Sequence, residues 1–209
     1  MSFFSRFRLY RYRIIWIFLL LCAVAVKGPH PGAQTLTDSA VNSDSIENVI
    51  YKDGVAYQEL MWDALIPEAY TAEEIMAKYD AELAKIEEGP DMAEQVQRLA
   101  DALLNNAPVN DKLDGAFVKL PGFIAPLEFS DEVITEFLLV PYFGACVHVP
   151  PPPANQTVLV KTVEGHGIEA DDAYDPVWIM GELTTERATT DLAEAGYYMA
   201  DALTEPYSE

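Results

Sequence analysis

The sequence has few basic residues and few cysteines. Its 209 residues include 13 Lys and Arg against 34 Asp and Glu, which gives a formal net charge of −21. Because such a chain lacks the cations that neutralise phosphates, its composition excludes nucleic acid as a partner and disfavours an anionic membrane surface. The only cysteines are Cys22 and Cys146. A glycine-rich phosphate loop, a nucleophile elbow, a zincin helix and a paired-cysteine redox motif are all missing.

The first 33 residues contain five Lys and Arg and no acid, followed in the rest of the chain by all 34 acidic residues. Within them, a basic stretch up to Arg13 precedes an apolar run from Ile14 to Val26. This pattern is typical of a secretory signal peptide, and the run is shorter than the ~20 residues that span a bilayer. We therefore predict a signal peptide over 1–33 and export to the periplasm. The alternative is an uncleaved N-terminal anchor, which would be the only contact with a membrane.

Cleavage of that segment would remove Cys22 and leave Cys146 as the only cysteine, so we expect no intramolecular disulfide. The polar residues that follow predict a flexible linker over 34–55, and a single domain is expected over 56–209. The segment from Tyr57 to Pro67 is expected to pack on that domain through its apolar side chains.

A helical hairpin is predicted over 72–106. Thr71 and Glu74 have the spacing of a capping box, which places a helix start at residue 72 and a helix up to about Glu88. Gly89 and Pro90 separate this helix from a second one that begins near Asp91. Apolar residues recur at helical spacing in both segments, so each helix is expected to bury one face.

Five segments with strand composition follow, over 116–127, 134–140, 157–163, 177–184 and 197–203, with a bend expected at Gly122. We predict an α+β fold, a small five-stranded OB-like Greek-key barrel over 113–205 preceded by the helical hairpin and the N-terminal export signal. A less regular β-sandwich is the alternative. The expected core consists of Phe117, Ile124, Phe137, Leu139, Val158, Val160, Trp178, Met180, Tyr198 and Leu203.

One segment carries an unusual combination of chemical groups. Cys146 and His148 are two residues apart, so on an extended backbone they point to the same side. The four residues Pro150, Pro151, Pro152 and Pro153 favour a stiff polyproline II rod. Asn155 and Gln156 follow and offer amide groups for orientation or capping. We expect Cys146, His148 and Asn155 to lie together on one side of the rod.

This segment, Phe-Leu-Leu-Val-Pro-Tyr-Phe-Gly-Ala-Cys-x-His-x-Pro-Pro-Pro-Pro-x-Asn-Gln from Phe137 to Gln156, resembles the signature of the bacterial domain-of-unknown-function family 3299. Further elements are similar, over 62–67, 108–110 and 120–128, so the resemblance covers roughly residues 56 to 206. The family comprises small exported proteins without a settled activity. Because some members lie beside ABC-type transport components, including zinc-responsive ones, the resemblance implies an accessory role in the cell envelope.

Three interpretations of Cys146 and His148 follow from their chemistry. A thiolate and an imidazole suit zinc or copper(I), with His166 or nearby carboxylates completing the ligand set. Alternatively, His148 could activate Cys146 in a thiol-dependent enzyme. Both residues could instead be structural, since buried cysteine is ordinary. The sequence favours a non-enzymatic periplasmic protein that binds a transition metal, with zinc as the candidate, or an ABC-type transport component; the thiol-dependent enzyme is the alternative.

Overall fold

A computed structural model describes residues 49–130, 132–146 and 150–208. All of them belong to one compact unit, Ser45–Glu209. The predicted signal peptide, most of the predicted linker and His148 lie outside the described residues. No described helix has the length and apolar character needed to cross a membrane.

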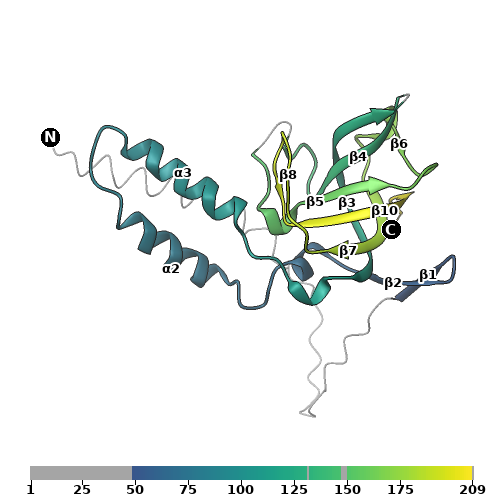
Figure 1. The fold of residues 1–209 in the computed structure, drawn as a ribbon, viewed down its shortest axis with the longest axis horizontal. Helices are drawn as coiled ribbons and strands as arrows, with labels where there is room; N and C mark the ends of the chain where they lie inside the picture. The colour runs from purple at the N-terminus through teal and green to yellow at the C-terminus, as the bar shows by residue number, and fades with distance from the viewer. Residues whose placement is uncertain (1–48, 131, 147–149, 209) are drawn as a thin grey trace, which may run out of the picture. The chain divides into compact units, whose positions relative to one another are not determined.

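Five strands form a closed barrel (Figure 1). They are β3 (Ala116–Ser130), β4 (Val133–Val140), β5 (Val158–Thr162), β7 (Val177–Thr184) and β10 (Tyr197–Pro206). Around the barrel the order is β3, β7, β10, β5 and β4, and β4 pairs again with β3. All pairs are antiparallel except β5 with β10, which is parallel. The predicted five-stranded OB-like barrel and the α+β class are confirmed.

The long strand β3 closes the barrel by pairing on both sides. Its first half, up to Gly122, pairs with β7, and its second half, from Phe123, pairs with β4. At Gly122 a Cβ atom would lie 2.8 Å from the Val140 carbonyl oxygen and 2.9 Å from the Leu139 side chain. Glycine is therefore required where β3 changes partner, because a side chain would collide with β4.

Alternate residues of the five strands fill the barrel with hydrophobic side chains. Phe137, Leu139, Val158 and Val160 are fully buried there as predicted, and Ile124 is also buried. Trp178 and Met180 are buried too, but outside this interior cluster, since β7 turns Val177 and Ile179 inward. The interior further contains Val118, Leu120, Ile134, Ile179, Leu183, Tyr197 and Met199.

Three of the predicted core residues are not in the core. Phe117 is 44% exposed and points outward, where its ring meets Tyr57 edge-on at 6.0 Å. Tyr198 and Leu203 are only partly buried. Tyr198 alternates with Tyr197 and Met199, which point inward, and a register shift between Met199 and Ala202 turns Ala202 inward in place of Leu203.

A β-hairpin precedes the barrel and includes the last residues of the range predicted as a linker, 34–55. Strands β1 (Val49–Lys52) and β2 (Val55–Glu59) pair antiparallel around Asp53 and Gly54. Both turn residues have positive φ, 52° and 83°, as an Asp-Gly hairpin turn requires. β2 then pairs parallel with β3 at Gln58 and Glu59. Residues 49–59 are therefore part of the sheet, and the apolar segment after Tyr57 packs on the barrel as expected.

The helical hairpin over 72–106 is confirmed. Helix α2 (Ala72–Leu83) begins where the Thr71 hydroxyl accepts a hydrogen bond from the Glu74 amide at 3.3 Å. It ends five residues before the expected Glu88, since the amides of Lys85 and Ile86 bond three residues back. Helix α3 (Met92–Asn105) contacts α2 (Figure 1).

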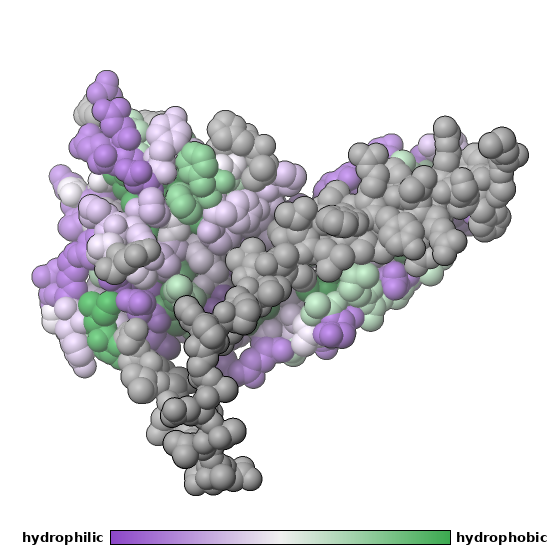
Figure 2. All heavy atoms as spheres, turned by 180° about the vertical axis from the view of Figure 1, so that it is seen from behind, coloured by the Kyte–Doolittle hydropathy of each residue, from purple (hydrophilic) through white to green (hydrophobic). Residues whose placement is uncertain are grey.

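The shorter elements connect these parts. They are η2 (Trp62–Leu65), η3 (Asp111–Leu113), η4 (Ala154–Gln156), β6 (Ile168–Glu169), η5 (Ala170–Asp172), β8 (Ala188–Thr189) and β9 (Glu194–Ala195). Between β7 and β10, the Arg187 guanidinium donates to the carbonyls of Asn105 and Ala107 at 3.0 and 2.6 Å. This contact fastens the end of α3 to the barrel. Seen from behind, the described surface is largely hydrophilic with separate apolar patches (Figure 2).

Candidate functional site

The amide side chains of the signature segment hold the fold together. In η4, Asn155 is 2% exposed, and its Nδ2 atom donates to the Pro108 carbonyl at 2.9 Å. Gln156 Nε2 donates to the Trp62 carbonyl at 2.8 Å. These bonds join the end of the proline-rich stretch to two other segments. Asn155 and Gln156 therefore orient the neighbouring chain segments around η4, which is one of the two roles expected for their amide groups.

Tyr197 completes this junction. Its side chain is fully buried, and its hydroxyl donates to the Leu65 carbonyl and accepts from the Asn110 amide, both at 2.6 Å. Burial raises the pKa of Tyr197 to about 12, so the hydroxyl keeps its proton at neutral pH. Sequence reasoning missed this residue because its two partners are backbone groups far away in the chain, so no pattern of side chains indicates them.

The outer face of β3, β4 and β5 is where OB domains commonly bind oligonucleotides and oligosaccharides. In this protein a second hydrophobic cluster occupies that face. Its buried members are Ala125, Leu138, Val140, Ala145, Leu159 and Ala195. The loop after β4 and the β8–β9 segment contribute Tyr142, Cys146, Ala188 and Leu192 to its edge. The chain's own loops thus cover much of this face.

A charged row crosses the same strands beyond the cluster. Glu136 of β4 pairs with Lys161 of β5 and lies beside Glu128 of β3. The Lys161 Nζ and Glu136 Oε2 atoms are 3.0 Å apart, and this hydrogen bond raises the pKa of Lys161. The outer face therefore changes from apolar to charged along the strands.

Cys146 lies at the edge of the apolar part, in the loop that follows β4. It is half-buried against the second cluster, and burial raises the pKa of its thiol to about 11. Its backbone is left-handed, with a φ of 67°. A side chain in this conformation costs ~1–2 kcal/mol relative to a right-handed residue, and glycine would avoid this cost. Strained residues of this kind cluster at functional sites, which makes the loop a candidate site.

The proline-rich stretch connects this loop to η4. Pro150 is exposed, Pro152 is buried, and Pro151 and Pro153 are intermediate. The Tyr142 hydroxyl donates to the Pro150 carbonyl at 3.4 Å, and burial raises the pKa of Tyr142. His148 lies outside the described residues, so its position beside Cys146 stays a prediction.

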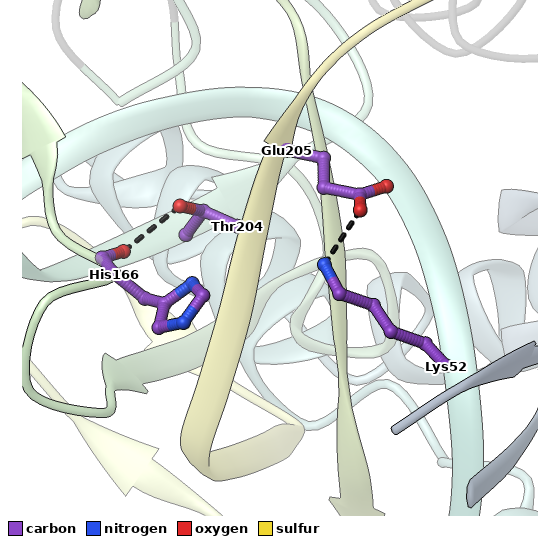
Figure 3. A network of polar contacts seen from close by, with 4 residues as sticks. All are labelled: Lys52, His166, Thr204 and Glu205. Carbon is purple, nitrogen blue, oxygen red and sulfur yellow. Dashed lines mark hydrogen bonds and ion pairs between the residues drawn. The ribbon is translucent and has the colours of Figure 1, made fainter. Parts of the chain in front are cut away.

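His166 lies elsewhere. Its carbonyl accepts a hydrogen bond from the Thr204 hydroxyl at 2.8 Å, and on the same strand Glu205 pairs with Lys52 at 2.6 Å (Figure 3). The neighbouring strand β6 pairs with the beginning of β4, whereas Cys146 follows the end of β4. A strand of eight residues is ~25 Å long. The structure therefore does not bring His166 to Cys146.

Metal ligands do not gather elsewhere in the described part of the chain. Among residues 49–130, 132–146 and 150–208, no three His, Cys, Asp or Glu side chains form a group that could hold a metal ion. A zinc site with three or more such ligands that uses Cys146 would thus need His148 or another residue outside the described ranges.

Three aromatic rings, two of them exposed, form a cluster next to Cys146. The Phe123 and Phe143 rings meet edge-on with centroids 5.8 Å apart, and Phe143 meets Tyr174 at 6.3 Å with a tilt of 54°. Phe143 and Tyr174 are 55% and 69% exposed. Sequence reasoning did not predict this cluster, because its members come from β3, from the loop after β4 and from the loop before β7.

Comparison with known proteins points to one family. The model of the family described as "Protein of unknown function (DUF3299)" matches residues 62–206. The crystal structure of a DUF3299 family protein from Pseudomonas aeruginosa PAO1 is similar, with 41% sequence identity and a TM-score of 0.55. The match covers 74% of this chain and 99% of that chain. No curated protein matches the sequence.

Proposed function

Because the chain belongs to the DUF3299 family of proteins of unknown function, we propose that it is a non-enzymatic accessory protein of the bacterial periplasm that binds a component of an ABC-type transporter. The N-terminal pattern of basic and apolar residues supports the location. The observation that carries the binding role is the exposed aromatic cluster of Phe123, Phe143 and Tyr174 beside the strained Cys146 loop.

Exposed aromatic rings are more typical of a surface that binds a protein than of an active site. Large aromatic side chains are enriched in the cores of protein interfaces, and they contribute binding energy when they are covered. Phe143 and Tyr174 are both more than half exposed, although each has an aromatic neighbour in contact. A partner that covers them would bury apolar area at ~25 cal/mol per Å².

The thiol does not support the enzyme alternative. A nucleophilic cysteine works as a thiolate, which requires a pKa near or below the ambient pH. Burial moves the pKa of Cys146 in the opposite direction, to about 11. We therefore do not propose thiol catalysis for this protein.

Zinc binding by Cys146 and His148 is the second candidate. It is favoured because position 146 has a cysteine, a zinc ligand, where the left-handed backbone would favour glycine. Zinc would have to displace the thiol proton, so its affinity should rise as pH rises. Calorimetry with zinc on the wild type, Cys146→Ala and His148→Ala tests this role. Micromolar binding that is lost in both variants would support it, and wild-type affinity in either variant would refute it.

Site-specific photo-cross-linking in cells tests the main proposal. A photoreactive phenylalanine analogue replaces Phe143, and in a control it replaces Tyr51, which is 76% exposed on β1. We expect a cross-linked product at position 143 that mass spectrometry identifies as a transporter component, and none at position 51. A product of the same yield at both positions, or none at position 143, would contradict the proposal.

A further inference from the structure

The loop that carries Tyr174 also carries three carboxylates close to it in the sequence. Two backbone hydrogen bonds between residues three apart make the loop compact. The Ala173 amide donates to the Ala170 carbonyl at 3.4 Å, and the Asp175 amide donates to the Asp172 carbonyl at 3.1 Å. Asp171, Asp172 and Asp175 are all exposed. No Lys or Arg occurs in the sequence between Lys161 and Arg187. The aromatic cluster therefore lies beside a segment of one charge sign.

Few cations on the described surface are free to meet an anionic partner. After residue 33 the chain has eight Lys and Arg residues. Five of them form ion pairs, namely Lys52, Lys85, Arg98, Lys112 and Lys161. Lys119 lies over the Trp178 ring at 4.2 Å, and Arg187 binds two backbone carbonyls. The eighth is Lys78, which is exposed on α2, so the charge of the described surface is predominantly negative.

We infer that the surface formed by Phe123, Phe143, Tyr174, Asp171, Asp172 and Asp175, called here the aromatic–acidic surface, binds a cationic segment of the partner protein. This inference rests on the proposed function. Aromatic faces attract Lys and Arg side chains, with ~0.5–1 kcal/mol for each exposed contact. The three carboxylates neutralise the same cations, and the rings cover the aliphatic stems next to them.

The ring geometry distinguishes this partner from flat ligands. The interplanar angles of 73° and 54° mean that the three rings do not form one plane. A sugar or a base stacks best on a flat platform, and phosphates would be repelled by the neighbouring aspartates. A peptide chain with alternating apolar and basic side chains fits both the tilted rings and the carboxylates.

Fluorescence anisotropy with a labelled synthetic peptide of alternating Arg and Leu residues tests the inference. A peptide with citrulline in place of Arg keeps the shape and removes the charge. We expect the Arg peptide to bind the wild type, and the double variant Phe143→Ser with Tyr174→Ser to bind it about 10-fold more weakly, which corresponds to ~1.4 kcal/mol. The triple variant Asp171→Asn, Asp172→Asn and Asp175→Asn should lose at least as much.

Two matched controls separate this site from general attraction to an acidic protein. Tyr51→Ser removes an exposed ring elsewhere, on β1. The triple variant Glu73→Gln, Asp80→Asn and Glu87→Gln changes the net charge by the same amount at exposed positions of the helical hairpin. Both controls should bind the Arg peptide within about 2-fold of the wild type, which is ~0.4 kcal/mol. Equal losses in both triple variants would refute the inference, as would equal binding of the citrulline peptide.

The remaining outcomes are distinguishable from failure of the proposed function. A cross-link to a transporter component at position 143, combined with no Arg peptide binding, would keep the proposed function and overturn the cationic segment. Specific binding of the Arg peptide without any transporter cross-link would keep the surface and overturn the proposed partner. A dimer that Tyr174→Ser dissociates would place a second copy of the chain on the surface and overturn the inference.

Discussion

The thiol of Cys146 is predicted to react slowly in the folded protein. Burial raises its pKa from the ordinary value of 9.0 to about 11. Since each pH unit changes the thiolate fraction tenfold, the folded protein has about 100-fold less thiolate at neutral pH than an unfolded chain. Only the thiolate attacks iodoacetamide, so labelling should be slower by the same factor. The assay uses the Cys22→Ser variant, in which Cys146 is the only cysteine.

The pH dependence of labelling separates a raised pKa from simple shielding. Shielding slows the reaction by a constant factor at every pH, whereas a raised pKa moves the midpoint of the rate profile upward. We expect the rate to rise about tenfold per pH unit from pH 7 to beyond pH 9. In urea the profile should return to a midpoint near the ordinary value. A plateau near pH 7 in the folded protein would refute the reasoning and restore the thiol-dependent enzyme.

The same shift links the thiol to stability. The folded-state pKa lies above the unfolded value, so the neutral thiol stabilises the fold at pH values below about 9. This contribution is lost as pH rises from about 9 to about 11, because the unfolded chain ionises first. The difference in urea midpoint between the wild type and Cys146→Ala should therefore shrink across that range. A difference that stays constant would show that Cys146 has the same pKa in both states.

Three further variants test the contacts that hold the barrel to its neighbours. Tyr197→Phe leaves the Asn110 amide and the Leu65 carbonyl without their partner, so we expect a loss of ~2–3 kcal/mol in urea unfolding followed by tryptophan fluorescence; a loss below ~0.5 kcal/mol would contradict this role. Gln156→Ala removes the bond to η2 and should cost ~1 kcal/mol in the same assay, whereas an unchanged midpoint would mean that water replaces the amide. Thr71→Ala removes the helix cap and should lower the unfolding free energy by ~1 kcal/mol, while Thr71→Ser should restore it.

The barrel could be predicted because each strand carries its own signal. The segments over 134–140 and 177–184 are apolar and flanked by turn residues, and both form strands at nearly those bounds. Whether a single residue points into or out of the barrel was harder to predict. Tyr198 alternates with the inward Tyr197 and Met199, and a later register shift in β10 turns Ala202 inward in place of Leu203. Phe117 alternates with the inward Val118 and contacts Tyr57 of β2 on the outside. Neither the phase of a strand nor a register shift is visible in local sequence.

The candidate site was only partly predictable for a similar reason. The sequence singled out Cys146, and the structure gives it a left-handed backbone and a place on the second cluster. It also singled out His166, which the fold places near the other end of β4. Proximity in three dimensions depends on how the strands pair around the barrel. The cluster of Phe123, Phe143 and Tyr174 arises from the same pairing, so no short motif could indicate it.

The signature segment combines two tasks, and this determines which variants can report on function. Phe137 and Leu139 fill the barrel, and Asn155 and Gln156 join η4 to other segments. Replacing any of these would disturb the fold first, so a lost activity would say little about a site. Phe143 lies in the same segment but is 55% exposed, so its replacement removes little buried area. A loss of binding with unchanged thermal unfolding in Phe143→Ser would therefore locate function on the surface, separately from the fold.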